Sequence, residues 1–211
     1  MTHRAVRVAV IDSGVHATHP HIGGVSGGIG IDDAGRAHDD YVDRLGHGTA
    51  VAAVIREKAP AAEIFVVKVF DRELAATGVA LVAAFERAIE QGAHVINLSL
   101  GTHNADHEAS LATVVREARA SGAIVVAAGE QDGVRWLPGA LGGVWPVLLD
   151  WSVPREECRV TVRSGSEPVF SASGFPRPIP GVPPEKNLKG LSFAVANVTG
   201  LVAAALSGSR D

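Results

Sequence analysis

The sequence has almost no cysteine and no excess of basic residues. Its one cysteine, Cys158, cannot form a disulfide within the chain, which excludes a disulfide-stabilised scaffold. Lys and Arg total 19 against 23 Asp and Glu, so the chain lacks the basic excess that binds phosphates, and we expect no nucleic-acid partner. The apolar fraction of 46% and the net charge of −4 exclude a disordered chain. The length of 211 residues suits a single domain, which we expect over residues 1–211.

Long uncharged runs are also scarce. The first apolar run, residues 8–11, stops at Asp12 and is too short for the core of a signal peptide. The longest uncharged run, residues 190–209, could span a bilayer by its length, but Asn197 and Thr199 make it a poor lipid-facing helix. We therefore expect no membrane segment, and instead a helix from about residue 192 to 206 that is buried on all sides.

Short apolar runs alternate with amphipathic stretches along the chain. The hydrophobic period predicts strands at residues 5–11, 63–70, 94–98 and 123–128, and helices at 48–55, 79–91 and 111–120. Strands that are apolar almost throughout are typical of a parallel sheet covered on both faces. The sequence therefore predicts an α/β fold with three layers, αβα, and a mostly parallel central sheet.

The second half of the chain is less regular. It offers short strand candidates at residues 144–150, 159–162 and 169–171. Proline is concentrated in residues 176–184, which predicts a loop there, because proline cannot donate a backbone hydrogen bond.

Three short motifs place Asp, His and Ser where such a sheet presents catalytic groups. Asp12 opens Asp-Ser-Gly directly after the first strand, His47 opens His-Gly-Thr at a helix start, and Ser192 lies at the start of the uncharged helix. Nucleophilic acyl transfer needs these three residue types, because an imidazole must take the serine proton and a carboxylate must orient the imidazole. A helix N-terminus also aims backbone N–H groups at a developing oxyanion.

The sequence resembles the subtilisin-like serine protease family, the subtilases, across nearly its whole length. The matching segments are residues 12–14 with His19-Pro20, then 47–49, 66–69, 95–101, 125–129, 170–174, 180–181 and 190–194. The resemblance implies that Ser192 is the nucleophile, His47 the general base and Asp12 the orienting carboxylate. It further implies a serine endopeptidase that cleaves peptide bonds through an acyl-enzyme and needs no cofactor.

The resemblance also implies where a peptide would bind. An extended substrate would pair between two segments of the chain, with main-chain hydrogen bonds for affinity and pockets for specificity. The implied substrate-binding residues are Leu74, Ala75, Ala76, Leu98, Ser99, Leu100, Gly101, Ala127, Ala128 and Gly129.

One departure from the family affects the oxyanion position. The family has Asn after Ala-Ala-Gly, and its amide donates to the oxyanion, whereas this chain has Glu130. An ionised carboxylate has no donor and repels an oxyanion. Three outcomes stay open: Glu130 is protonated in an apolar site and donates, it turns away and leaves only the backbone N–H of Ser192, or it has a non-hydrolytic or regulatory role.

Two further departures lie beside the nucleophile. Leu191 stands where the family has Thr, and Ala196 stands where it has a helix Pro. Leu191 removes a capping hydroxyl near the helix start, and Ala196 restores a backbone N–H that proline lacks. Both changes could alter the first turn of the helix. Small shifts of Ser192 could change whether water or an amine attacks the acyl-enzyme, so a peptide ligase or transpeptidase stays open.

No metal site is predicted. His16, His19 and His21 form only a weak zinc pattern, because neither cysteine nor a second cluster supports it. The calcium loop of the family is replaced by the short stretch at residues 56–62, so we expect that site to be absent.

Acidic residues gather before His47. They are Asp32, Asp33, Asp39, Asp40 and Asp43. We interpret them as a solvated acidic loop. A second interpretation is a negative rim, to which Asp71 and Glu73 contribute, that favours basic residues in the substrate.

The sequence therefore predicts a serine endopeptidase with a peptide or protein substrate, such as a precursor peptide. The alternative is a catalytically impaired subtilase fold that binds a peptide or a partner. With one thiol and no visible pro-segment, the expected location is cytoplasmic. The sequence predicts no oligomeric state.

Overall fold

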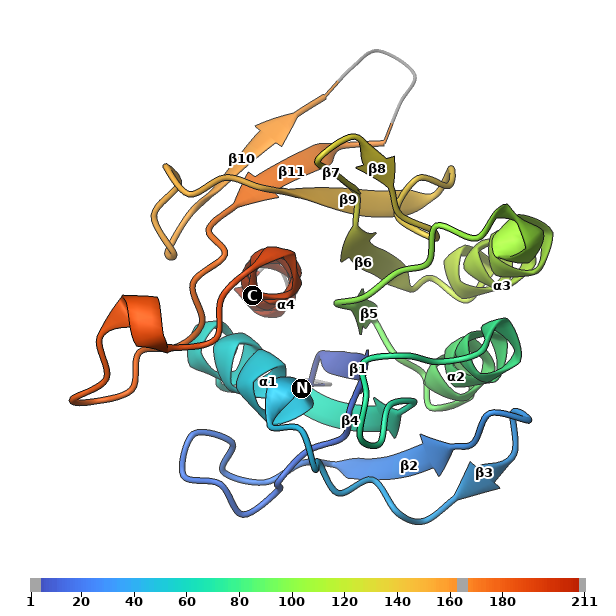
Figure 1. Cartoon of the computed structure of the whole chain (residues 1–211), viewed down its shortest axis with the longest axis horizontal. Coiled ribbons are helices and arrows are strands. Elements are labelled where there is room, and N and C mark those ends of the chain that lie inside the picture. Colours follow the sequence, from blue (N-terminus) through green and yellow to red (C-terminus); the bar gives the residue numbers. More distant parts are fainter. Residues whose placement is uncertain (1–4, 163–166, 209–211) are drawn as a thin grey trace.

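The computed structural model describes residues 5–162 and 167–208. They form a central sheet between two layers of helices (Figure 1). The predicted three-layer α/β fold is therefore confirmed.

The central sheet has nine strands in the order β10-β11-β9-β6-β5-β1-β4-β2-β3. The strands are β1 (Arg7–Asp12), β2 (Gly27–Ile31), β3 (Ala37–His38), β4 (Glu63–Lys68), β5 (Val95–Leu98), β6 (Ile124–Ala128), β9 (Val144–Leu149), β10 (Cys158–Thr161) and β11 (Val169–Ala172). Neighbouring strands are parallel except at the two edges, where β10 pairs with β11 and β2 with β3 in antiparallel fashion. The prediction of a mostly parallel sheet is confirmed.

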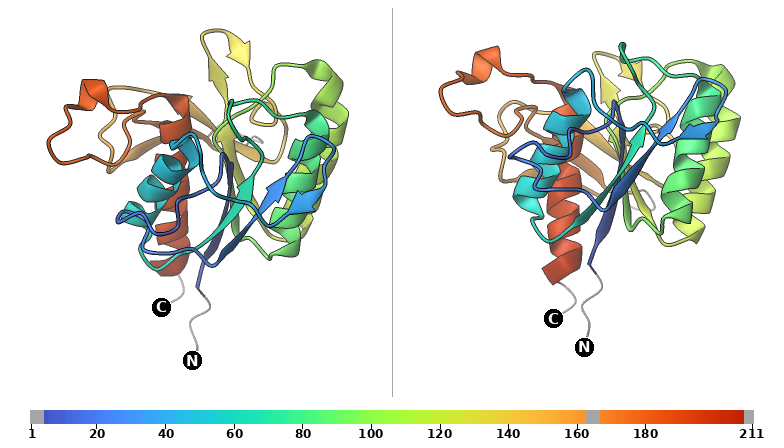
Figure 2. Two further views of the ribbon diagram at one scale, coloured as in Figure 1. Left: turned by 60° about the horizontal axis from the view of Figure 1, so that its bottom comes forward. Right: turned by 90° about the horizontal axis from the view of Figure 1, so that it is seen from below.

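The helices cover both faces of the sheet. They are α1 (His47–Lys58), α2 (Gly78–Glu90), α3 (Glu108–Ala120) and α4 (Leu191–Gly208), with short 3-10 turns η1 (Ala105–His107) and η2 (Pro184–Lys186). The pair α1 and α4 packs on one face, and α2 and α3 pack on the other (Figure 2).

Strand β1 shows why the central strands are apolar throughout. Successive side chains of a strand point to opposite faces of the sheet. Val8 and Val10 belong to the core on the side of α1 and α4, whereas Ala9 and Ile11 belong to the core on the side of α2 and α3. Because both faces are covered, neither set can be polar.

Within the described residues, α4 is the one helix long and apolar enough to cross a membrane by length and composition. Of its most apolar window, 56% is buried inside the protein. Asn197 and Thr199 are fully buried and hydrogen-bonded there. The helix therefore packs as a core helix, as expected, although its last turn is more exposed than a helix buried on all sides.

Strands β2 and β3 and a small hairpin, β7 (Glu130–Gln131) with β8 (Val134–Arg135), were not predicted. Strand β2 is mostly glycine, which has low strand propensity, and it is held by its parallel register with β4. Strands β3, β7 and β8 have two residues each and are too short to show a hydrophobic period.

Strand order creates a crevice at one end of the sheet. Strand β1 lies between β4 and β5, because the chain continues to β4 on one side and later to β5 on the other. Such a switch opens a crevice beyond the carboxyl ends of the strands, where ligands bind in open α/β sheets. Asp12 ends β1, Ala128 ends β6 and Ser99 follows β5, so all three lie at that end.

Candidate active site

Asp12 and His47 form the most direct contact at this end of the sheet. Oδ1 of Asp12 lies 2.7 Å from Nδ1 of His47, and it also accepts the backbone N–H of Ser13 at 2.7 Å. The Asp12 side chain is fully buried, and that of His47 is 12% exposed. A carboxylate in this position holds the proton on Nδ1 and leaves Nε2 free to accept another.

Two glycines allow this close approach. Gly14 has φ +100°, and a Cβ there would lie 2.4 Å from the carbonyl oxygen of Tyr41. A Cβ on Gly48 would lie 2.2 Å from the carbonyl oxygen of Gly14 and 3.2 Å from Oδ1 of Asp12. The glycines of both motifs therefore bring β1 and the start of α1 into contact.

Asp43 fixes the start of α1. Its carboxylate accepts the N–H and the hydroxyl of Thr49 at 2.8 and 2.6 Å, and the hydroxyl of Ser13 at 2.9 Å. The Ser13 hydroxyl in turn accepts the N–H of Gly48 at 2.9 Å. Helix α1 has no side-chain cap from Gly46, so Asp43 satisfies N–H groups that a helix start leaves free.

The interpretation of Asp43 as part of a solvated acidic loop is therefore wrong. The sequence position of Asp43 could have indicated this role, because a carboxylate four residues before His47 can reach the first turn of the helix. Asp40 is exposed but forms an ion pair with Arg44, and Asp71 pairs with Arg44 and with the buried Lys68. Arg44 and Lys68 therefore offset the charges of Asp40 and Asp71 within the negative rim that the second interpretation requires.

Nearby charges set the protonation of His47. Burial by itself disfavours the imidazolium, but the hydrogen bond and charge of Asp12 and the charge of Asp43 outweigh it, so the pKa of His47 is raised. Burial likewise opposes ionisation of Asp43, but its hydrogen bonds from Thr49, Leu45 and Ser13 keep its pKa below the usual value.

Activity should depend on pH through this raised pKa. His47 must be neutral to accept a proton, so kcat/KM should rise with pH through a pKa above the ordinary histidine value of 6.5. The measurement is kcat/KM on one short peptide from acid to alkaline pH, which gives the pKa of the free enzyme. A rising limb centred at or below 6.5 would contradict the arrangement described here.

Ser192 lies in the first turn of α4. Its hydroxyl donates to the carbonyl oxygen of Ser99 at 3.2 Å rather than to His47. The ring of the next residue, Phe193, lies 5.6 Å from the His47 ring, centroid to centroid. Serine–histidine hydrogen bonds often form only once substrate is bound, so this position is compatible with a nucleophile.

Ser192 opens onto a cleft of about 520 Å³. The predicted substrate-binding residues in its lining are Leu74, Ala75, Ala76, Ser99, Leu100, Gly101 and Ala128. The cleft is also lined by Phe70, Thr102, His103 and Trp136, which no sequence motif marked. The structure therefore brings both predicted segments to the cleft of Ser192.

Three of the predicted substrate-binding residues lie elsewhere. Leu98 and Ala127 are fully buried and pair with each other inside the sheet, so their side chains cannot reach a substrate, which corrects the prediction for these two. Gly129 lines a neighbouring cavity instead.

Glu130 is exposed and does not line the cleft of Ser192. It pairs with Arg135 in the β7–β8 hairpin and borders the neighbouring cavity together with Gly129. The exposed side chain therefore lacks the apolar surroundings that the first of the three outcomes requires. Of the three outcomes for Glu130, this geometry favours the one in which the side chain turns away.

A buried polar network supports the segment that faces Ser192. Thr199 of α4 donates its hydroxyl to Oδ1 of Asn97 at 2.8 Å, and Nδ2 of Asn97 donates to the hydroxyl of Ser99 at 2.9 Å. All three residues are almost fully buried. Since buried polar groups are costly when unpaired, the network fixes the position of Ser99 relative to α4.

Thr199→Val should destabilise the fold by about 1–3 kcal/mol, because it keeps the side-chain shape but leaves Oδ1 of Asn97 buried without a donor. Thr113→Val is the matched control, since Thr113 is exposed on α3, and its effect should stay within about 0.5 kcal/mol. Urea unfolding of the wild type and both variants gives the two differences. Equal stability of the two variants would show that the network contributes nothing.

His16, His19 and His21 line one cavity of about 320 Å³. Nδ1 of His19 accepts the backbone N–H of His21 at 3.2 Å, and the two rings meet edge to face at 5.1 Å. Across residues 5–162 and 167–208, no group of three or more His, Cys, Asp or Glu is placed to hold a metal ion.

Known proteins resemble this chain over most of its length. The model of the subtilase family matches residues 3–146. Subtilisin E of Bacillus subtilis (strain 168) is 30% identical over 216 residues, covering 97% of this chain and 54% of the relative. Subtilisin of Bacillus pumilus is 29% identical, covering 97% of this chain and 74% of the relative. The chain spans about half the length of most of the curated relatives it matches.

A solved structure has the same fold. The crystal structure of a lanthipeptide protease matches with a TM-score of 0.73 and 21% sequence identity, covering 97% of this chain and 74% of that chain. At this identity the match shows the common fold alone.

Proposed function

Because the chain belongs to the subtilase family, we propose that it is a serine endopeptidase that hydrolyses peptide bonds through an acyl-enzyme on Ser192. The observation that carries the proposal is the 2.7 Å contact of buried Asp12 with Nδ1 of His47, whose ring lies 5.6 Å from that of Phe193, the residue next to Ser192. Asp12 ends β1, and Ser192 donates to Ser99 directly after β5, so both lie at the crevice end of the sheet, which supports acyl transfer by these residues.

In the first half of the reaction, the hydroxyl of Ser192 leaves the carbonyl oxygen of Ser99 and attacks the carbonyl carbon of the substrate. The Oγ–C bond forms, the carbonyl π electrons move to the oxygen, and Nε2 of His47 takes the hydroxyl proton. Asp12 stabilises the imidazolium. His47 then gives its proton to the leaving amine as the C–N bond breaks. In the second half, His47 takes a proton from water as its oxygen attacks the acyl carbon. His47 then returns a proton to Oγ of Ser192 as the ester bond breaks and the acid leaves.

The substrate would bind as an added strand. Residues 99–101 follow β5, and the far end of this segment is fixed by two backbone hydrogen bonds between Thr102 and Leu137, at 2.9 and 2.8 Å. Residues 74–76 lie across the cleft. An extended peptide between the two segments would place its scissile bond at Ser192, with main-chain hydrogen bonds supplying the affinity.

The substrate we propose is a precursor peptide, and the location we propose is the cytoplasm. The protein of the matched structure is a protease of a lanthipeptide, which supports a processing role for the same fold. The free thiol of Cys158 is compatible with a reducing compartment.

The second candidate function is a peptide-binding module with impaired catalysis. Glu130 in place of the oxyanion Asn favours it, because one donor to the developing charge is missing. A ligase or transpeptidase is the third candidate function, since an amine can attack the acyl-enzyme in place of water.

One experiment distinguishes these functions. The protein is incubated with a library of unstructured peptides, with and without an added amine, and products are identified by mass spectrometry. New free carboxyl ends support the endopeptidase, and amide products formed with the amine support the ligase. Peptides that bind but stay intact, for the wild type as for Ser192→Ala, support the binding module and contradict the proposed function.

A further inference from the structure

The substitution at Glu130 leaves the oxyanion with one donor fewer. The negative charge that develops on the substrate oxygen needs donors that are already in place before the reaction. The backbone N–H of Ser192, in the first turn of α4, can supply one. Glu130 does not supply the second, because it is exposed and does not line the cleft of Ser192.

The next residue, Gln131, lines the cleft of Ser192, which Glu130 does not. Neighbouring side chains of a strand point to opposite sides, and Glu130 and Gln131 are the two residues of β7. Gln131 is half-buried and lines both the cleft of Ser192, together with Ser99 and Ala128, and the neighbouring cavity, whereas Glu130 lines the neighbouring cavity alone. Gln131 therefore brings a side-chain amide to the border of the cleft of Ser192, one position after the expected one.

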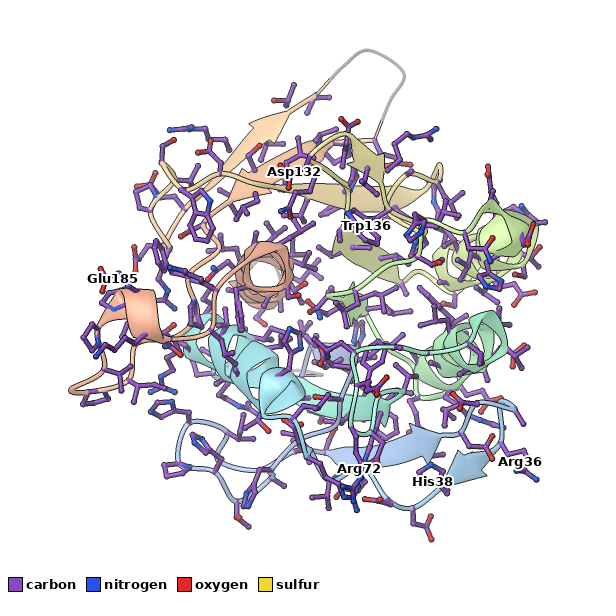
Figure 3. All side chains as sticks on the ribbon, viewed as in Figure 1. Arg36, His38, Arg72, Asp132, Trp136 and Glu185 are labelled. Atoms are coloured by element: carbon purple, nitrogen blue, oxygen red, sulfur yellow. The ribbon has the colours of Figure 1, made fainter. Side chains whose placement is uncertain are left out.

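The hairpin holds Gln131 in this place. Gln131 pairs with Val134, and Asp132, with φ +53°, forms the tight turn between the two strands. Backbone hydrogen bonds at Gly129, to Val147 at 2.9 Å and from Trp136 at 3.2 Å, tie the base of the hairpin to β9. Figure 3 marks Asp132 at the turn and Trp136 after the second strand. A backbone fixed at both ends restricts the amide to few positions.

The amide of Gln131 also has a donor to spare. Its Nε2 carries two N–H groups, and one of them donates to Oδ2 of the exposed Asp132 at 3.2 Å, a long hydrogen bond. The other N–H remains for a ligand in the cleft. The amide is thus held at one side and still able to donate.

We propose that Gln131 is a catalytic residue that donates its side-chain N–H to the oxyanion, in place of the asparagine that the family has one position earlier. The assignment rests on the proposed function, since it concerns the same acyl transfer. As Oγ of Ser192 bonds to the carbonyl carbon and its proton passes to His47, the carbonyl oxygen gains the electron pair and accepts hydrogen bonds from Gln131 and from the N–H of Ser192.

Gln131→Glu and Gln131→Ala test this role. Each removes the donor, and kcat should fall about 10²–10³-fold with KM little changed, a range that itself comes from subtilisin, a relative of this chain. Gln91→Glu is the matched control, because Gln91 is exposed at the end of α2, and it should leave kcat unchanged. Thermal unfolding confirms that all three variants are folded.

A transition-state analogue gives a second readout. A peptide aldehyde adds to Ser192 and forms a tetrahedral adduct whose oxygen occupies the oxyanion position, whereas the matching peptide amide does not react. Gln131→Ala should weaken aldehyde binding by at least tenfold and leave amide binding unchanged. Equal losses for both ligands would show a role in the cleft and not at the oxyanion.

The outcomes separate this assignment from the proposed function. If the wild type cleaves peptides and both Gln131 variants keep kcat within threefold, Gln131 is not the donor although the endopeptidase stands. If the wild type neither cleaves peptides nor binds the aldehyde more tightly than the amide, the proposed function and this assignment both fail.

Discussion

Ser192→Ala should lower kcat by about 10⁶-fold, a magnitude known from the matching change in subtilisin, a relative of this chain. Without the hydroxyl no acyl-enzyme forms, and only the binding of the peptide and the remaining oxyanion donors still act. Peptide affinity should stay within a few-fold of the wild type, because the main-chain groups of residues 99–101 are unchanged. Hydrolysis rates and calorimetric binding of one peptide give both quantities.

Ser207→Ala is the control for this change. Ser207 lies in the last turn of the same helix, where its hydroxyl donates to the carbonyl oxygen of Ala203 at 2.9 Å. The variant should keep full activity. A Ser192→Ala protein that still hydrolyses peptides within tenfold of the wild type would mean that another residue is the nucleophile.

Asp12→Asn should lower kcat by about 10⁴-fold, the loss seen when the equivalent carboxylate is replaced in an unrelated serine protease. The amide of asparagine would donate to Nδ1 of His47 and force the ring proton onto Nε2. Nε2 could then no longer accept the proton of Ser192. The rising limb of kcat/KM should also move to lower pH, because the contact with Asp12 raises the pKa of His47.

Asp39→Asn is the matched control, since Asp39 is exposed in the loop before His47. It removes the same charge and should change neither kcat nor the pH profile appreciably. A loss of less than tenfold for Asp12→Asn, or a limb that stays in place, would show that Asp12 does not orient His47.

Much of this site could be predicted because its signals are local. The central strands are apolar throughout since both faces are buried, and parallel strands bring their carboxyl ends together. Asp12 and Ser99 therefore had to lie at one end of the sheet once the strands were assigned. The resemblance to the subtilases was confirmed by the match of the family model to residues 3–146.

The rest depends on contacts between distant segments. Asp43 looked like a solvated residue, and only the fold returns its carboxylate to Ser13 and to the start of α1. Leu98 and Ala127 were expected at the substrate, but both still belong to the sheet, because β5 ends at Leu98 and β6 at Ala128. Gln131 belongs to a two-residue strand with no period of its own, so its direction is set by the hairpin alone.

The central claim is that Ser192 is a nucleophile activated by His47 and Asp12. Labelling by a fluorophosphonate probe, followed by peptide mapping, tests it most directly. The account predicts a single adduct on Ser192 that forms faster as pH rises through the pKa of His47 and is absent from Ser192→Ala. An unlabelled wild type from acid to alkaline pH, or an adduct on another residue, would contradict it.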